Sequence, residues 1–171
     1  MTPTQTRSQS IPAVMIRFLD NASVALAGSR DADLVPHVHR LSGWAMEQDG
    51  QTMLCLVARG FTDGLAERLQ KNGQFSATVE VISSHETHQF KGHYIDSRPA
   101  NAGDRELVAR CTERFVAAVR QVFGDRFSVE SLRTYIPEAA LAVRFRVREI
   151  YVQTPGPAAG QRLFPLEDPL P

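Results

Sequence analysis

The segment VISSHETHQFKGHYI, residues 81–95, carries more structural and chemical information than any other part of the chain. Two alternating runs flank the polar tip SSHE, which is the pattern of a β-hairpin. Residues two apart on a strand share a face, so Gln89, Lys91 and His93 form a polar row, with Phe90 on the opposite face. This row of an amide, an amine and an imidazole suits the edge and the phosphate of a planar, anionic ligand. It is equally compatible with an ordinary solvated face.

Length and composition place the chain among single-domain globular proteins. It has 171 residues, of which 43% are hydrophobic. The 19 basic and 19 acidic side chains give a formal net charge of zero, which argues against a nucleic-acid partner, because a basic excess supplies that affinity. No run of about 18 apolar residues occurs, so we expect no membrane segment.

Two further features predict a cytoplasmic protein. The first ten residues, MTPTQTRSQS, lack the apolar core of a secretory signal. Cys55 and Cys111 lie in apolar contexts on separate elements, which favours buried free thiols over a disulfide.

Hydrophobic periodicity predicts six strands and three helices. The strands are expected at 23–29, 35–46, 52–58, 74–82, 87–95 and 141–153, and the helices at 12–21, 62–71 and 104–123. In the first helix, Val14, Phe18 and Leu19 are expected on one side. Thr62 or Asp63 is expected to cap the second helix, and Asn72-Gly73 to end it.

Three regions follow from this reading. Residues 1–10 are expected to be disordered, residues 11–154 to form the domain, and residues 155–171, rich in Pro and Gly, to form an extended tail. Strands joined mostly as hairpins do not fit a parallel sheet. The sequence therefore predicts a mainly β fold with flanking helices, a six-stranded antiparallel barrel. Because a small barrel is filled by its own side chains, a ligand would bind outside it or at a subunit junction.

Four pieces in order resemble the pyridoxamine 5'-phosphate oxidase-like, FMN-binding split-barrel superfamily. They are SVALAGSRDADLVPHVHRLSGW, the Asp-Gly hairpin with TMLCLVA, GLAERLQKNGQFSATVEV and THQFKGHY, spread over residues 12–98. The resemblance implies a split β-barrel and a homodimer with FMN bound at its interface. It also implies that Arg40 offers its guanidinium to the cofactor, that Gln89 approaches the flavin ring, and that Lys91 is a neighbouring basic group.

The chain departs from the family at the phosphate-binding segment. The family places a serine and a lysine at the start of the helix after the third strand, where this chain has Asp63 and Leu65. An aspartate repels a phosphate and leucine has no donor. Thr62 and Arg59 lie close by, and a helix N-terminus favours anions, so these two residues are candidates to replace the missing groups.

Trp44 and a row of arginines each have two interpretations. Trp44 stacks on a flat ring, or it belongs to the core or a dimer interface. Arg144, Arg146 and Arg148 share one face of the last strand, and they either recognise an anion or form a solvated face.

Histidines offer a metal or haem alternative. His37 and His39 share a face of one strand, and His88 or His93 would have to supply a third ligand. Polar residues on an exposed face need no ligand, and we assign no metal.

The sequence therefore favours an FMN-binding protein, an FMN-dependent oxidoreductase acting on an unidentified small molecule, with the cofactor supplying the redox chemistry. No catalytic acid or base is assigned. The alternative is a non-catalytic small-molecule-binding module that has kept the barrel and lost flavin; a haem-binding relative is a third reading.

Overall fold

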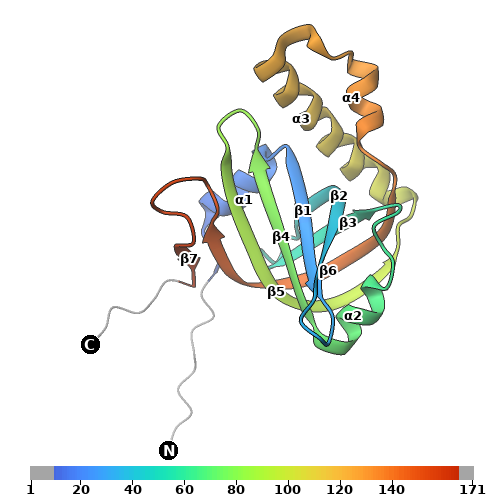
Figure 1. The fold of residues 1–171 in the computed structure, drawn as a ribbon, viewed down its shortest axis with the longest axis vertical. Helices are drawn as coiled ribbons and strands as arrows, with labels where there is room; N and C mark the ends of the chain where they lie inside the picture. The colour runs from blue at the N-terminus through green and yellow to red at the C-terminus, as the bar shows by residue number, and fades with distance from the viewer. Residues whose placement is uncertain (1–9, 166–171) are drawn as a thin grey trace, which may run out of the picture.

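The computed structural model describes residues 10–165, and its centre is a closed antiparallel barrel (Figure 1). Seven strands form one sheet in the order β3-β2-β1-β4-β5-β6-β7, and a further pairing of β3 with β6 closes six of them into a ring. The strands are β1 (Val24–Arg30), β2 (Pro36–Met46), β3 (Thr52–Ala58), β4 (Gln74–Val81), β5 (Glu86–Pro99), β6 (Ala139–Val152) and β7 (Arg162–Phe164). The predicted six-stranded split barrel is confirmed.

Apolar side chains fill the barrel, as the alternating pattern predicted. Phe75, Phe90 and Phe145 are buried in the interior, and the rings of Phe75 and Phe145 meet edge to face at 5.3 Å between centroids. Cys55 and Cys111 are buried free thiols. This packing leaves the interior to the core, so binding surfaces must lie outside.

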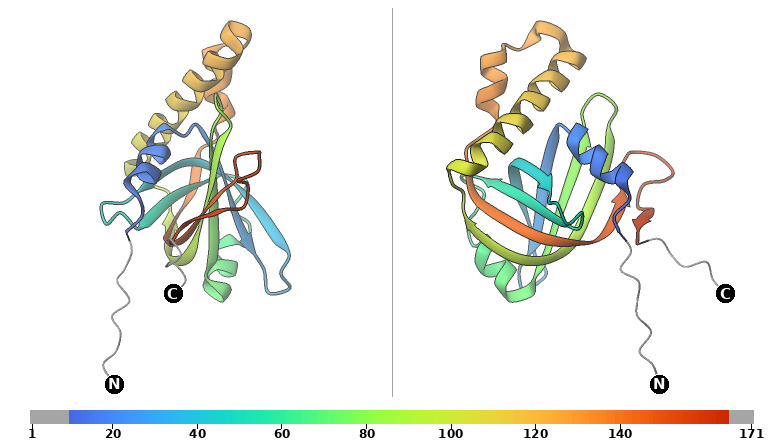
Figure 2. Two further views of the ribbon diagram at one scale, coloured as in Figure 1. Left: turned by 90° about the vertical axis from the view of Figure 1, so that its left-hand side faces the viewer. Right: turned by 180° about the vertical axis from the view of Figure 1, so that it is seen from behind.

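Helix α1 (Ala13–Asn21) covers part of the barrel, as Figure 2 shows from behind. It buries Met15, Phe18 and Leu19. Val14 was expected on this side, but its side chain is 54% exposed, because the helix turns Met15 inward together with Phe18 one turn later.

Helix α2 (Leu65–Asn72) lies beside the barrel after β3. The predicted cap at Thr62 or Asp63 is wrong, because the N-cap is Gly64 in the left-handed conformation, with no side-chain capping bond. Gly73 ends the helix in the left-handed conformation, as predicted.

An arm of two helices projects from the barrel (Figure 2). The turns η1 (Ala102–Asp104) and η2 (Gly124–Arg126) flank α3 (Arg105–Phe123), and α4 (Val129–Tyr135) returns beside it. The sequence did not predict α4, whose seven residues are too short for a clear periodicity. A small separate cluster holds the arm together and consists of Phe115, Val116, Val119 and Leu132.

The two ends of the chain were expected to lack regular structure. Residues 1–9, where disorder was expected, lie outside the described residues. The expected extended tail, residues 155–171, instead contains the strand β7, which pairs with β6, and its residues 166–171 lie outside the described residues. None of the described helices is both long and apolar enough to cross a membrane.

Gly92 permits the long pairing of β5 with β6. The register between these strands shifts at Lys91 and Gly92, and a Cβ atom on Gly92 would overlap the carbonyl oxygen of Arg146. The two strands therefore approach each other more closely there than any side chain would allow.

We expect Gly92→Ala to lower the free energy of unfolding by at least about 3 kcal/mol, the upper range for overpacking, because the backbone must move to admit a methyl group. Denaturant unfolding checks this. Gly28→Ala is the matched control in another strand, since its Cβ would meet only the rotatable Oγ of Ser76, at 2.9 Å. Equal losses in the two variants would contradict the argument.

Candidate functional site

Strand register gathers several predicted residues on the outer face of the sheet. Arg40 lies opposite Leu26, Leu26 opposite Thr78, Thr78 opposite Gln89, and Gln89 opposite Tyr151. Directly paired residues of neighbouring strands point to the same side of a sheet. These five side chains therefore form one row across β2, β1, β4, β5 and β6.

A second row lies next to the first, two residues along each strand. It consists of Val38, Gly28, Ser76, Lys91 and Glu149. Arg40 on β2 and Gln89 on β5 are three strand positions apart. Because neighbouring strands lie about 4.8 Å apart, these two residues are separated by about 14 Å across the sheet. We call these two rows the outer face.

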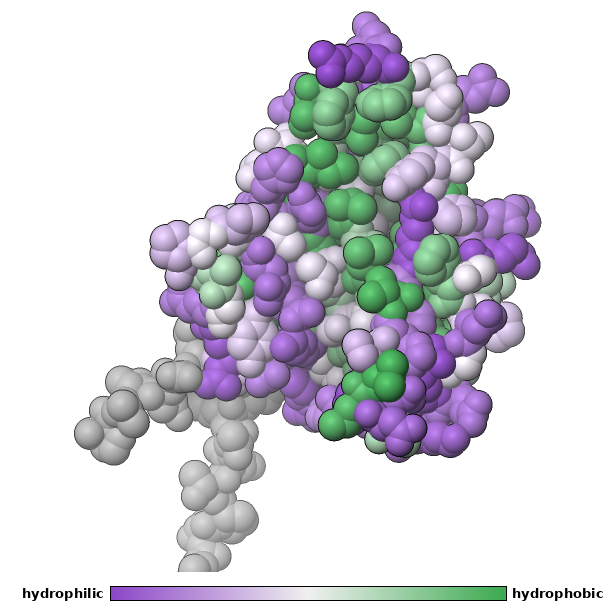
Figure 3. All heavy atoms as spheres, in the orientation of Figure 1, coloured by the Kyte–Doolittle hydropathy of each residue, from purple (hydrophilic) through white to green (hydrophobic). Residues whose placement is uncertain are grey.

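The outer face carries two exposed apolar side chains, Leu26 on β1 and Val38 beside Arg40 on β2. Leu26 is 48% exposed and Val38 is 65% exposed, although both lie within strands. Figure 3 shows hydrophobic residues in a band that runs from the arm down over the sheet. The outer face thus offers apolar contacts at Leu26 and Val38 near the Arg40 end, the small polar side chains Thr78 and Ser76 on β4, and an amide and an amine on β5.

Arg40 lies at a cavity of about 320 Å³, lined also by Val38, Phe61, Tyr135 and Ile136. Its Nη2 donates to the carbonyl oxygen of Tyr135 at 2.7 Å, and its guanidinium stacks on the Tyr135 ring at 3.9 Å from the centroid. This orients the guanidinium toward the end of α4 and leaves its other N–H groups without a partner among the described residues.

Gln89 and Lys91 lie at the other end. The amide nitrogen of Gln89 donates to Thr78 Oγ1 at 3.2 Å, so the amide oxygen remains available as an acceptor. The ammonium group of Lys91 lies 4.6 Å from the centroid of the Tyr151 ring. Glu149, which lies opposite Lys91 in the strand register, forms an ion pair with Arg162 at 3.8 Å.

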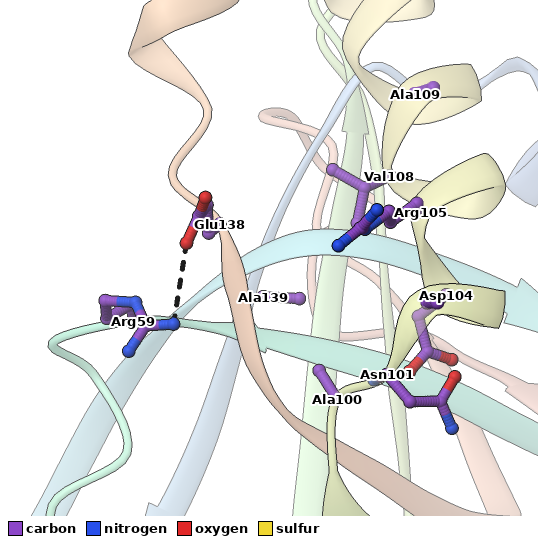
Figure 4. Close-up of a pocket in the computed structure, with 10 residues that line it drawn as sticks. Arg59, Ala100, Asn101, Asp104, Arg105, Val108, Ala109, Glu138 and Ala139 are labelled. Atoms are coloured by element: carbon purple, nitrogen blue, oxygen red, sulfur yellow. Dashed lines mark hydrogen bonds and ion pairs between the residues drawn. The ribbon is translucent and has the colours of Figure 1, made fainter.

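Neither Arg59 nor Thr62 makes a hydrogen bond or ion pair with the residues of the outer face described above. Arg59 pairs with Glu138 at 3.4 Å and lines a different cavity (Figure 4). The carbonyl oxygen of Thr62 accepts from Leu65 in the turn before α2. The loop that carries both residues is fixed by its backbone bonds, which the sequence pattern does not reveal.

Trp44 packs in the core, one of the alternatives left open above. Its side chain is 3% exposed, and its Nε1 donates to the carbonyl oxygen of Leu19 at 3.3 Å. It therefore fixes α1 to β2.

In the row Arg144, Arg146 and Arg148 on β6, two of the arginines form ion pairs with carboxylates. Arg144 donates twice to Glu47, at 2.7 and 2.8 Å, and once to Asp96 at 2.8 Å. Arg146 pairs with Asp49 at 3.7 Å. Because these carboxylates already satisfy two of the three arginines, we do not assign anion recognition to the row.

The paired histidines have partners within the protein. His37 contacts Asp31 at 3.2 Å, while His39 lies between Ser29, at 2.8 Å from Nε2, and the carbonyl oxygen of Phe61, at 2.6 Å from Nδ1. A carbonyl only accepts, so Nδ1 carries the proton and Nε2 accepts from the Ser29 hydroxyl. No three potential ligands gather around a metal position in the described part of the chain.

Three residues of this region were missed by sequence reasoning: Thr78, Tyr135 and Tyr151. Thr78 and Tyr151 become visible only through the register that places them beside Gln89. Tyr135 lies at the end of the unpredicted α4, and no sequence signal connects it with Arg40.

Comparisons with known proteins concern the fold. No family model matches the chain, and no curated protein matches it. The structure is similar to HupZ of Group A Streptococcus, at 15% identity and a TM-score of 0.49, covering 88% of this chain and 99% of that one.

The structure is also similar to two other solved structures. One is an FMN-binding protein from Syntrophomonas wolfei, with 14% identity, a TM-score of 0.46, and coverage of 82% of this chain and 89% of that one. Another is a pyridoxamine 5'-phosphate oxidase-related, FMN-binding protein from Nostoc punctiforme, with 11% identity, a TM-score of 0.46, and coverage of 88% and 83%. The split-barrel class of this chain rests on its own strand order and closure.

His39 makes stability depend on pH. Burial lowers the pKa of this imidazole, and the nearby Arg68 and His37 act in the same direction. Below about pH 6.5 the unfolded chain binds a proton that the folded chain resists, so the free energy of unfolding falls with decreasing pH.

We expect His39→Gln to lose part of the decline in stability between about pH 7.5 and 5.5, as measured by denaturant unfolding at each pH. His93→Gln, at an exposed strand position, is the control and should keep the wild-type decline. The interpretation fails if the His39 variant declines as steeply as the wild type.

Proposed function

We propose that the chain binds FMN on the outer face and acts as an FMN-dependent oxidoreductase on a small molecule. The observation that supports this most directly is that exposed Leu26 and Val38 share one face of the sheet with Arg40, Gln89 and Lys91. The resemblance of the sequence to FMN-binding split-barrel proteins points to the same ligand.

The donor set of the outer face fits the parts of a flavin nucleotide. A planar ring packs well against exposed apolar side chains, and an open amide oxygen on Gln89 suits an N–H at the ring edge. Lys91 and Arg40 supply positive charge for anionic groups, Arg40 through the N–H groups that Tyr135 does not use.

A bound flavin supplies hydride or two-electron transfer. The chain's own side chains hold and orient it and exclude water from the apolar side of the ring.

We further propose a homodimer that covers the outer face. On one chain this face is open, and exposed apolar groups in the middle of a sheet are unfavourable in water. A second copy would bury Leu26 and Val38 and close the site.

A second candidate function is a binding module that has lost flavin. The Arg40 guanidinium already donates to Tyr135 and stacks on its ring, and Asp63 stands in the phosphate-binding segment. Both features weaken phosphate binding.

We expect purified protein to bind FMN saturably in a fluorescence titration, and Arg40→Ala and Lys91→Ala each to weaken binding by about 1.5–3 kcal/mol through loss of charge-assisted hydrogen bonds. Lys71→Ala, which removes an exposed lysine paired with Glu67, is the matched control and should bind as the wild type does.

A titration with riboflavin, which lacks the phosphate, distinguishes contacts to the flavin ring from contacts to the phosphate. If Arg40 holds the phosphate, Arg40→Ala affects FMN and leaves riboflavin binding unchanged. A protein that binds neither flavin would favour the binding module, whereas Arg40 and Lys91 variants with wild-type FMN affinity would refute the assignment of these two residues.

For the dimer, we expect the wild type to have twice the chain mass in light scattering after gel filtration and Val38→Glu to be monomeric, since a buried carboxylate without a partner is costly. Val14→Glu on α1, at a position 54% exposed, is the control and should remain dimeric. A monomeric wild type would refute this proposal.

A further inference from the structure

A second cavity, of about 560 Å³, lies between the start of α3 and the start of β6 (Figure 4). It shares no lining residue with the cavity at Arg40. Small apolar side chains line much of it: Ala100, Val108, Ala109 and Ala139.

Two arginines face this space from different elements. Figure 4 shows Arg105 projecting from α3 on one side and Arg59 lying after β3 on the other, with Ala139 between them. Within the described part of the chain, the side chain of Arg105 makes no hydrogen bond or ion pair, so no neighbouring carboxylate pairs with its guanidinium.

The nearest acidic groups do not cancel this positive charge. Asp104 accepts two bonds from Arg98, both at 2.8 Å, and one from the backbone of Asn101. The pKa of Asp104 is lowered chiefly by its hydrogen bond with Arg98, so the carboxylate is committed to that pair.

The ion pair of Arg59 with Glu138 is easily exchanged. Its two side chains are 71% and 82% exposed, and the atoms are 3.4 Å apart. Exposed pairs of this kind contribute little to stability, so a ligand anion can take the place of Glu138 at small cost.

We propose that this cavity binds a small molecule with a carboxylate or phosphate group at one end and a compact apolar body. Arg105 and Arg59 hold the anionic oxygens, and the alanine and valine side chains contact the body. The site uses none of the residues of the outer face, and it gives Arg59 a role other than the phosphate contact considered from the sequence.

The test uses the full chain and three probes of one shape: benzoate, phenyl phosphate and the neutral benzyl alcohol. Binding is followed by NMR of methyl-labelled alanine. We expect one or both anions to shift the signals of Ala100, Ala109 and Ala139 saturably, and benzyl alcohol to leave them unchanged. A response to benzoate alone identifies a carboxylate ligand, and a response to phenyl phosphate alone a phosphate ligand.

Variants connect the binding to the two arginines. Arg105→Gln and Arg59→Gln should each weaken it at least tenfold, and Glu138→Gln should strengthen it by removing the competing carboxylate. Arg126→Gln is the matched control, because it removes the same charge from an exposed position in η2 at the far end of α3. The proposal is overturned if neither anion binds saturably, if the shifts fall on other alanines, or if Arg126→Gln weakens binding as much as Arg105→Gln does.

Discussion

The pairing of β3 with β6 is the constraint on which the rest of the structure depends. It joins Thr52–Ala58 to the first half of Ala139–Val152, strands that are far apart in the chain, and turns a sheet into a closed barrel. Closure leaves no exposed edge at these strands and encloses a core of aromatic and branched side chains. A ligand must consequently bind on the outside, where the same strands present their other face.

Closure of the barrel also determines which side chains lie together at the two candidate sites. On one side, the register through β2, β1, β4, β5 and β6 aligns cationic, apolar and amide groups in rows. On another side, β6 begins beside α3, which places Arg105 near the loop that follows β3. The arm links these regions, because Tyr135 at the end of α4 contacts Arg40 and Glu138 shortly afterwards contacts Arg59.

Much of the barrel could be predicted from local patterns. Apolar residues alternate along the last strand, and three of them, Val143, Phe145 and Val147, are buried, while the Asn72-Gly73 pair predicted the end of α2. The errors have local causes as well. Gly64 took the capping role expected of Thr62 or Asp63, because the left-handed conformation at Gly64 starts the helix later. Helix α4 was missed because its stability comes from packing against α3 rather than from its own pattern.

Alternation and turn residues by themselves therefore determined an antiparallel barrel in which Gln89 and Lys91 share a polar face opposite Phe90, while Arg40 was named only through the family resemblance. Tertiary structure alone decided which of these side chains are neighbours and which already have partners. Periodicity shows the face of a strand but not the strand beside it, and contacts between distant segments depend on register and closure. For this reason Trp44 lies in the core, Arg144 is held by two carboxylates, and Arg59 faces Arg105 across a cavity that no sequence motif predicts.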